Sequence, residues 1–337
     1  MKIDFYLPPL PISEATDFAV KAESLGYDAF FTTDTQHEPF LPLVSAATAT
    51  ERIQLGTAIA VAFARSPMTV AYAGWDLAAL SEGRFLLGLG SQVKGHITRR
   101  FSMPWSSPGP RMREYIAAMR AIWDTWQNGS PLGFKGDFYE FTLMTPFFDP
   151  GPIKHPEIPV YVAGVNEYMS RLAGETCQGF HAHPFHTIQY LDEVVLAAMA
   201  QGAADAGRTL DDVEVVSTVF VITGNDEEEM STSRSAVRQQ VAFYASTPAY
   251  SVVLDTHGWD FGRELTAMSK RGQWAEMAEV ITDEVLDEVA VTAPIDVLAS
   301  KVRERYGDRA QRIGLYSPVP LQLDDDGWAE LIASFQA

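Results

Sequence analysis

Cysteine is almost absent from this sequence, since Cys177 is the only one among 337 residues. A single cysteine excludes an internal disulfide and any cysteine-rich metal cluster. Long apolar runs are also missing, because no stretch approaches the roughly 20 consecutive apolar residues that a membrane helix needs. The N-terminus carries Asp4 and two prolines where a signal peptide would have an apolar run. We therefore expect a cytoplasmic protein with no membrane partner.

Basic residues are scarce, with 25 Lys and Arg against 44 Asp and Glu and a net charge of −19. A surface this negative repels nucleic acid, so we expect no nucleic-acid partner. Acidic residues are in turn absent between Gly83 and Arg113, where six cations occur: Arg84, Lys94, Arg99, Arg100, Arg111 and Arg113. Two interpretations stay open: a solvated face paired with acids elsewhere, or a pocket for an anionic ligand.

Short apolar runs alternate with amphipathic helical segments along the chain. The runs lack clean alternation, which is typical of parallel strands covered on both faces. They are Ile3–Leu7, Ala29–Thr33, Ile53–Ile59, Arg84–Gly90, Ile158–Gly164, Gly179–His183, Val213–Ile222 and Arg312–Tyr316. This pattern predicts a single (β/α)8 TIM barrel over residues 1–337. A doubly wound sheet is the alternative, but no G-x-G-x-x-G follows the first run.

Two stretches exceed the minimal strand–helix unit, and we expect both as insertions at the C-terminal face. One covers about residues 131–157 and contains FKGDFYEF at 134–141, which predicts a small hairpin. The other covers residues 246–293 and is mostly helical in pattern. The C-terminal face is where barrel enzymes keep their chemistry.

The segments at the C-terminal ends of the predicted strands should line the mouth of the barrel. They are Thr33–His37, Ala60–Arg65, Gly90–Gln92, Gly164–Asn166 and His181–His183. Arg65 follows an apolar run, so it either faces the mouth or extends over the rim. Aromatic residues that could wall a substrate cavity are Trp105, Phe147, Phe148, Tyr244 and Tyr250.

Three histidines cluster in GFHAHPFHT, and a strand would place His181 and His183 on one face. Together with His37 they could imitate a metal site. However, no H-x-H follows the first strand and no carboxylate stands at an obvious ligand spacing, so we expect no metal. We expect at least one of His181, His183 and His186 to be a packing residue, while the others can contact the substrate.

The fifth predicted strand runs into Gly164, Val165 and Asn166 and then directly into a helix at Glu167–Thr176. Free backbone N–H groups and the helix dipole at such a junction make a phosphate site. Ordinary loop chemistry would equally favour Gly and Asn there, and this alternative stays open.

Several motifs together resemble the bacterial luciferase-like superfamily. They are GTAIAVAFARSP at 56–67, GRFLLGLGS at 83–91, FKGDFYEF at 134–141, IPVYVAGVN at 158–166, AGETCQGF at 173–180 and PIDVLASKVRERYGDRAQRIGLYSP at 294–318. The most similar branch uses coenzyme F420, a deazaflavin, and includes methylenetetrahydromethanopterin reductases and F420-dependent glucose-6-phosphate dehydrogenases. The resemblance covers essentially the whole chain.

The resemblance implies a (β/α)8 barrel, a non-prolyl cis peptide at Ala58-Ile59 behind the deazaflavin ring, and a homodimer. It also implies cofactor phosphate binding at the fifth-strand loop. The cofactor-binding candidates are thus Asp34, Ala58, Ile59, Arg65, Ser91, Gln92, Gly164, Val165 and Asn166, with Arg99 and Arg100 for the polyglutamate tail.

The sequence departs from these relatives at two positions that concern proton transfer. Relatives often carry Asp-His after strand two, whereas here Thr35 follows Asp34 and the histidine is His37. Relatives such as the sugar-phosphate enzymes carry a Glu near the position of Val93, which cannot transfer a proton. Proton transfer would then fall to histidines or to the substrate, and the catalytic candidates are His37 and His183.

The sequence therefore predicts an F420-dependent oxidoreductase that moves a hydride between the cofactor and a small organic substrate. The segment without acids supports F420, because this cofactor has a phosphate and a polyglutamate tail. FMN, in contrast, carries only the phosphate. The alternatives are an FMN-dependent two-component monooxygenase and a non-enzymatic flavin-binding protein.

Overall fold

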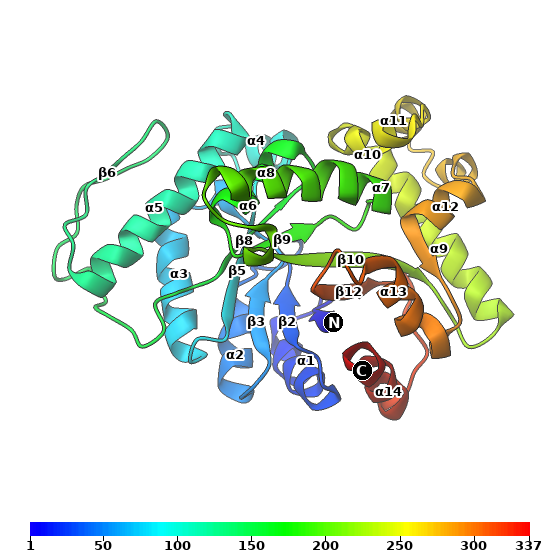
Figure 1. Cartoon of the computed structure of the whole chain (residues 1–337), viewed down its shortest axis with the longest axis horizontal. Helices are drawn as coiled ribbons and strands as arrows, with labels where there is room; N and C mark the ends of the chain where they lie inside the picture. Colours follow the sequence, from blue (N-terminus) through cyan, green and yellow to red (C-terminus); the bar gives the residue numbers. More distant parts are fainter.

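Eight parallel strands close into a barrel in the computed structural model, which describes residues 1–337 (Figure 1). They are β1 (Lys2–Tyr6), β2 (Ala29–Thr32), β3 (Gln54–Thr57), β5 (Phe85–Gly90), β8 (Val160–Gly164), β9 (Gly179–Ala182), β10 (Glu214–Ile222) and β12 (Arg312–Tyr316). Each strand pairs with its neighbour in this order, and β12 closes the ring against β1 with Lys2 opposite Arg312. The predicted (β/α)8 barrel is confirmed.

The third strand is shorter than predicted, and two further strands join the sheet. β3 ends at Thr57, the Ala58-Ile59 peptide bond is cis as the resemblance implied, and β4 (Ala60–Val61) then pairs with β5. β11 (Ala290–Thr292) comes from the predicted helical insertion. It pairs with β10 at Phe220–Ile222, since β9 covers that edge of β10 only as far as Ser217.

Helices cover the outside of the barrel. They are α1 (Ile12–Leu25), α2 (Leu41–Ala49), α3 (Pro67–Leu80), α4 (Lys94–Arg99), α5 (Pro108–Asn128), α6 (Glu167–Thr176), α7 (Ile188–Tyr190), α8 (Ala197–Asp205), α9 (Glu227–Ala245), α10 (Ser251–His257), α11 (Gly262–Lys270), α12 (Asp283–Val289), α13 (Leu298–Tyr306) and α14 (Asp325–Gln336). A π-helical turn at Leu191–Leu196 joins α7 to α8. Ser66 caps α3 by accepting the Met68 N–H, and Gly26 ends α1 with a left-handed φ of 94°.

Aromatic rings fill the barrel interior, and glycines on other strands make room for them. A Cβ added to any of these glycines would lie within 3 Å of a ring atom, so a larger residue would displace the ring. The pairs are Tyr6 with Gly314, Phe31 with Gly56, Tyr161 with Gly179, and His181 with Gly88.

A buried polar layer lies at the strand N-termini, at the end of the barrel away from the mouth. Arg312 is fully buried and donates to both carboxylate oxygens of Asp4 at 2.7 and 2.8 Å. It also donates to the Gln54 Oε1 at 2.7 Å. Because a buried charge is costly unless it is paired, the buried Arg312 depends on both partners, Asp4 and Gln54, being present.

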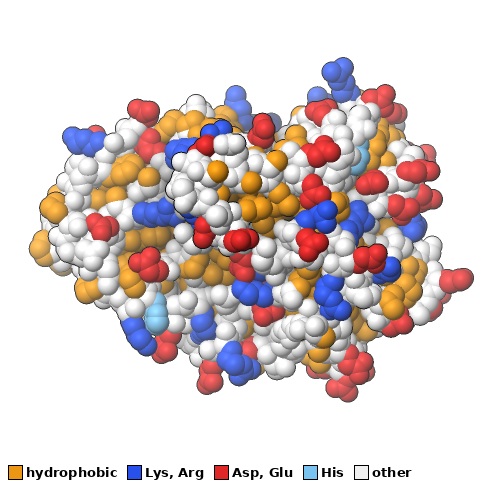
Figure 2. Space-filling view, viewed as in Figure 1, with side chains coloured by type: hydrophobic (Ala, Val, Ile, Leu, Met, Phe, Trp, Pro, Cys, Tyr) orange, Lys and Arg blue, Asp and Glu red, His pale blue; other side chains and the backbone are white.

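The two predicted insertions differ in their surroundings. The first contains the predicted hairpin, formed by β6 (Phe134–Lys135) and β7 (Glu140–Phe141), and it packs against α5 and α3. The second contains α10, α11 and α12 and lies in the upper right of Figure 1. Acidic side chains are frequent over that part of the surface in Figure 2. None of the helices is both long enough and apolar enough to cross a membrane.

Candidate active site

The loop after β2 is fastened to the chain that follows β4. The Asp34 carboxylate is buried and accepts the Val61 N–H at 2.9 Å and the Arg65 Nη1 at 2.5 Å. Arg65 also pairs with Glu38 at 3.1 Å. Glu38 in turn accepts the Phe40 and Leu41 N–H groups at the start of α2. Arg65 is therefore mostly buried between two carboxylates and is not a free receptor for an anion.

His37 lies between these two anchored carboxylates. Its side chain is exposed, and no side chain or backbone group of the chain hydrogen-bonds to it. The loop is fixed on both sides of it, since Asp34 and Glu38 both bind Arg65. The arrangement leaves an imidazole available to a ligand on a restrained loop. Sequence reasoning missed Glu38, which is visible as an acid at the end of the polar run.

The loop after β5 holds Ser91 and Gln92 at the same end of the barrel. Gln92 has a left-handed backbone with φ 56°, an uncommon conformation for a residue other than glycine. Its side-chain Oε1 accepts the Val93 N–H at 2.9 Å, and the Ser91 hydroxyl donates to the Gln92 carbonyl at 3.2 Å. These bonds turn the chain from β5 into α4.

The loop after β8 is built as the sequence predicts. Asn166 caps α6 by accepting the Met169 N–H at 3.2 Å. Gly164 is required there, because a Cβ would lie 2.3 Å from the Met169 Cβ. The Val165 carbonyl accepts the Tyr190 hydroxyl at 2.7 Å. Asn166 thus serves as an ordinary N-cap, while the N–H groups of Glu167 and Tyr168 in the first turn lack intrahelical partners and remain available to an anion.

His181 and His186 are core residues. His181 lies inside the barrel, edge-on to Phe31 at 5.3 Å, and its Nε2 has no partner. His186 bonds the His183 carbonyl at 2.7 Å through Nδ1 and the Tyr306 hydroxyl at 3.0 Å through Nε2. Burial, aided by the Arg312 charge, lowers the pKa of His181 to about 3, and burial lowers that of His186 to about 4. Both are neutral, and the expectation that at least one histidine of this segment is a packing residue is confirmed.

His183 has different surroundings, at the end of β9. Its ring stacks on Tyr250 with centroids 4.3 Å apart and meets Tyr244 edge-on at 4.7 Å. Its Nδ1 accepts the Phe185 N–H at 3.1 Å. Burial lowers the pKa of His183 to about 3. The structure therefore brings together His183 and two of the predicted cavity-wall residues.

The other predicted wall residues lie elsewhere. Phe147 and Phe148 are 89% and 60% exposed on the first insertion, where the Phe148 carbonyl accepts the Tyr72 hydroxyl of α3 on the outside of the barrel. The prediction that these two line the cavity is wrong, because the insertion runs along α3. Trp105 packs edge-on against Phe63 at 6.0 Å.

The six cations of the segment without acids do not form one pocket. Arg84 precedes β5 at the opposite end of the barrel and donates to the Ala47 and Thr50 carbonyls. Arg111 is buried over the Phe63 ring, and Arg113 pairs with Glu175. A single pocket from all six is therefore wrong.

Three cations remain exposed on or next to α4, namely Lys94, Arg99 and Arg100. Arg100 donates to the Thr35 carbonyl at 3.4 Å, so this group adjoins the His37 loop. We call these three residues the α4 cations.

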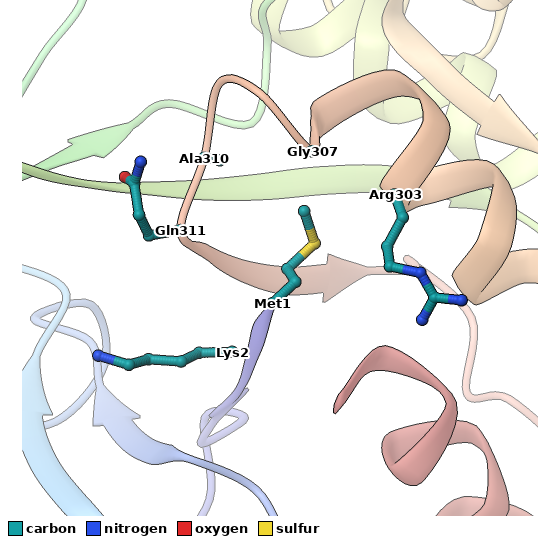
Figure 3. Close-up of a pocket in the computed structure, with 6 residues that line it drawn as sticks. All are labelled: Met1, Lys2, Arg303, Gly307, Ala310 and Gln311. Atoms are coloured by element: carbon teal, nitrogen blue, oxygen red, sulfur yellow. The ribbon is translucent and has the colours of Figure 1, made fainter. Parts of the chain in front are cut away.

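A separate hollow of about 430 Å³ lies near the N-terminus and α13 (Figure 3). Its polar side chains already have partners in the chain: Lys2 pairs with Glu214, Gln311 accepts the Val215 N–H, and Arg303 donates to the Ser334 carbonyl. The hollow lies beside the strand N-termini, away from the loops described above. No group of three or more His, Cys, Asp or Glu side chains is placed to hold a metal ion.

The fold agrees with the comparisons with known proteins. Residues 5–312 match the luciferase-like monooxygenase family, and the chain belongs to this family. The uncharacterized protein Rv1360 of Mycobacterium tuberculosis is 47% identical over 314 residues, which cover 93% of this chain and 92% of that protein.

Two further matches concern the F420 branch of the family. An F420-dependent glucose-6-phosphate dehydrogenase of Intrasporangium calvum is 31% identical over 217 residues, covering 60% of this chain and 63% of that protein. The structure of the coenzyme F420-dependent tetrahydromethanopterin reductase of Methanopyrus kandleri superposes with a TM-score of 0.79 at 20% identity, covering 98% of this chain and 96% of that one. The chain is thus a TIM-barrel oxidoreductase of the luciferase-like family, and the loops described above lie at the mouth of its barrel.

Proposed function

We propose that this protein is a coenzyme F420-dependent oxidoreductase that moves a hydride between the deazaflavin and a small organic substrate. The observation that carries the proposal is the position of the α4 cations beside the restrained His37 loop. F420 has a phosphate and a polyglutamate tail, whereas FMN has only the phosphate. Three exposed cations next to the mouth suit a ligand with several carboxylates, and an F420-dependent relative supports the same choice.

The residues at the mouth suit such a cofactor in three separate places. The open N–H groups at the start of α6 can bind its phosphate. Ser91, Gln92 and the Ala58-Ile59 segment lie where strands β5 and β3 end, and they would border the ring. Lys94, Arg99 and Arg100 would bind the tail. When bound, the deazaflavin supplies the hydride chemistry, and the barrel supplies position and exclusion of water.

Arg65 and Asp34 have a supporting role in this proposal. Their ion pair holds the start of the His37 loop against the segment after β4, so neither charge is free for the cofactor. His37 is the group that would donate or accept the substrate proton, because its exposed imidazole has no partner in the chain and an imidazole can both donate and accept a proton. His181 and His186 are buried and neutral and would take no part.

An FMN-dependent two-component monooxygenase is the second candidate, since the family description names monooxygenases. A parallel titration separates the two. The apoprotein is titrated with F420 and with FMN while its tryptophan fluorescence is recorded. We expect F420 to bind at least tenfold more tightly, and tighter binding of FMN would overturn the proposal.

A non-enzymatic flavin-binding protein would show no turnover of any substrate with either bound cofactor.

We also propose that two copies of the chain associate through α2 and α3. α2 has no charged residue, and Asp76 is the single charged residue of α3. Leu41, Val44 and Leu80 on these helices are nevertheless 56%, 47% and 42% exposed. In a chain of net charge −19, such a face lets two copies meet with little repulsion.

A further inference from the structure

His183 is held in a single orientation and a single tautomer. Tyr250 stacks on one face of the imidazole at 4.3 Å, and Tyr244 meets it edge-on at 4.7 Å. The Nδ1 accepts the Phe185 N–H at 3.1 Å, so Nδ1 carries no proton. In the neutral ring the proton must therefore be on Nε2, which makes Nε2 a hydrogen-bond donor.

The Nε2 of His183 is open to a ligand. No group of the chain bonds to it, and it is not among the side-chain atoms that are sealed from solvent without a partner. The Nε2 of His181 is sealed in this way. The two histidines of the same strand end therefore differ, because the Nε2 of His181 is sealed and the Nε2 of His183 is not.

Further aromatic groups adjoin the two tyrosines that contact the His183 ring. The Tyr244 hydroxyl lies 3.5 Å from the Tyr316 hydroxyl at the end of β12, and Phe220 stacks on Tyr316 at 4.8 Å. We call His183, Phe220, Tyr244, Tyr250 and Tyr316 the aromatic corner. No lysine or arginine hydrogen-bonds to one of these five side chains or stacks on one of their rings. The α4 cations belong to a different part of the mouth, next to the β2 loop.

We infer that the aromatic corner binds an uncharged substrate through a carbonyl or hydroxyl oxygen that accepts the Nε2–H of His183. This inference rests on the proposed function and specifies the substrate class of the same site. An anionic group placed here would lose its hydration with no cation to compensate it. A carbonyl oxygen needs only one donor, and the tyrosine rings can cover the apolar part of the molecule. A phosphorylated sugar is thus a poor fit to this corner.

The test compares benzaldehyde with 4-formylbenzoate, which share a ring and an aldehyde and differ by one carboxylate. Protein labelled with ¹⁵N-histidine is titrated with each, and the His183 resonances are followed by NMR. We expect an unprotonated Nδ1, a shift of the Nε2 signal on addition of benzaldehyde, and at least tenfold weaker binding of 4-formylbenzoate. Equal or tighter binding of the carboxylate, no binding of either compound, or a protonated Nδ1 would overturn the inference.

Two variants test the donor itself. His183→Phe keeps a ring between the tyrosines and removes the Nε2–H, so its affinity for benzaldehyde should fall at least fivefold. His183→Gln keeps an amide donor and should retain more affinity than the Phe variant, while His155→Phe, remote from the corner, should match the unmodified protein. Wild-type affinity in His183→Phe would refute the role. These titrations need no cofactor, so their failure is separate from a failure to bind F420.

Discussion

Three histidines with lowered pKa values should make the folded protein sensitive to acid. His181 and His183 have pKa values lowered to about 3, and His186 has a pKa lowered to about 4, mainly by burial. In the unfolded chain each would titrate near its ordinary value of about 6.5. Below that pH the unfolded state binds protons that the folded state cannot bind. The free energy of unfolding therefore has its full value above pH 6.5 and decreases as the pH falls from 6.5 toward 4.

The magnitude follows from the shifts. One pKa unit corresponds to about 1.36 kcal/mol, and pH 5 lies about 1.5 units below the unfolded value. Each histidine then costs about 2 kcal/mol at pH 5, and the three together cost about 6 kcal/mol. Since domains are stable by only about 5–15 kcal/mol, this loss should be large in an unfolding experiment.

Urea unfolding followed by circular dichroism at pH 8 and pH 5 measures the effect. His181→Leu removes one of the three titrating groups, and it breaks no hydrogen bond because the His181 Nε2 has no partner. We expect the difference between pH 8 and pH 5 to shrink by about 2 kcal/mol in this variant. His37→Gln is the control, since His37 is exposed and its replacement should leave the difference unchanged. An undiminished pH dependence in His181→Leu would refute the reasoning.

Three further predictions concern the cofactor, the proton and the interface. Arg99→Glu with Arg100→Glu should weaken F420 binding by about 1–3 kcal/mol, less at high salt, with little effect on FMN in the same titration; equal losses would show that these residues do not contact the tail. His37→Ala should lower kcat by roughly 10²–10⁴ and leave cofactor affinity within a few fold, whereas unchanged turnover would exclude the proton-transfer role. Leu41→Asp with Val44→Asp should convert a dimer to a monomer in light scattering after gel filtration, and a monomeric unmodified protein would contradict the proposed interface.

The local pattern of the sequence was sufficient for most of the fold. Hydrophobic periodicity is a property of neighbouring residues, so it predicts α6 with the same bounds as the structure. The hairpin at β6 and β7 and the order of the barrel strands follow from the same kind of signal. β11 was missed because its three residues pair only with an edge that β9 leaves uncovered.

The candidate site was predicted less completely, because charge pairs form between segments that are far apart in the sequence. Arg65 lies 31 and 27 residues from its partners Asp34 and Glu38, and no local pattern signals that pairing. The six cations between Gly83 and Arg113 separate because a strand, a short helix and a long helix carry them to different ends of the barrel.

The segment GFHAHPFHT separates what the sequence determines from what the tertiary structure determines. Residue type and strand spacing alone determine that three imidazoles occur together at the end of β9. Their different roles depend on what the barrel places around each one: Phe31 and Tyr161 around His181, Tyr306 and Ser217 beside His186, and Tyr244 and Tyr250 around His183. These partners come from other strands and from α9, α13 and the chain beyond α9, so only the closed barrel leaves the Nε2 of His183 unsealed and without a partner and buries the other two histidines in the core.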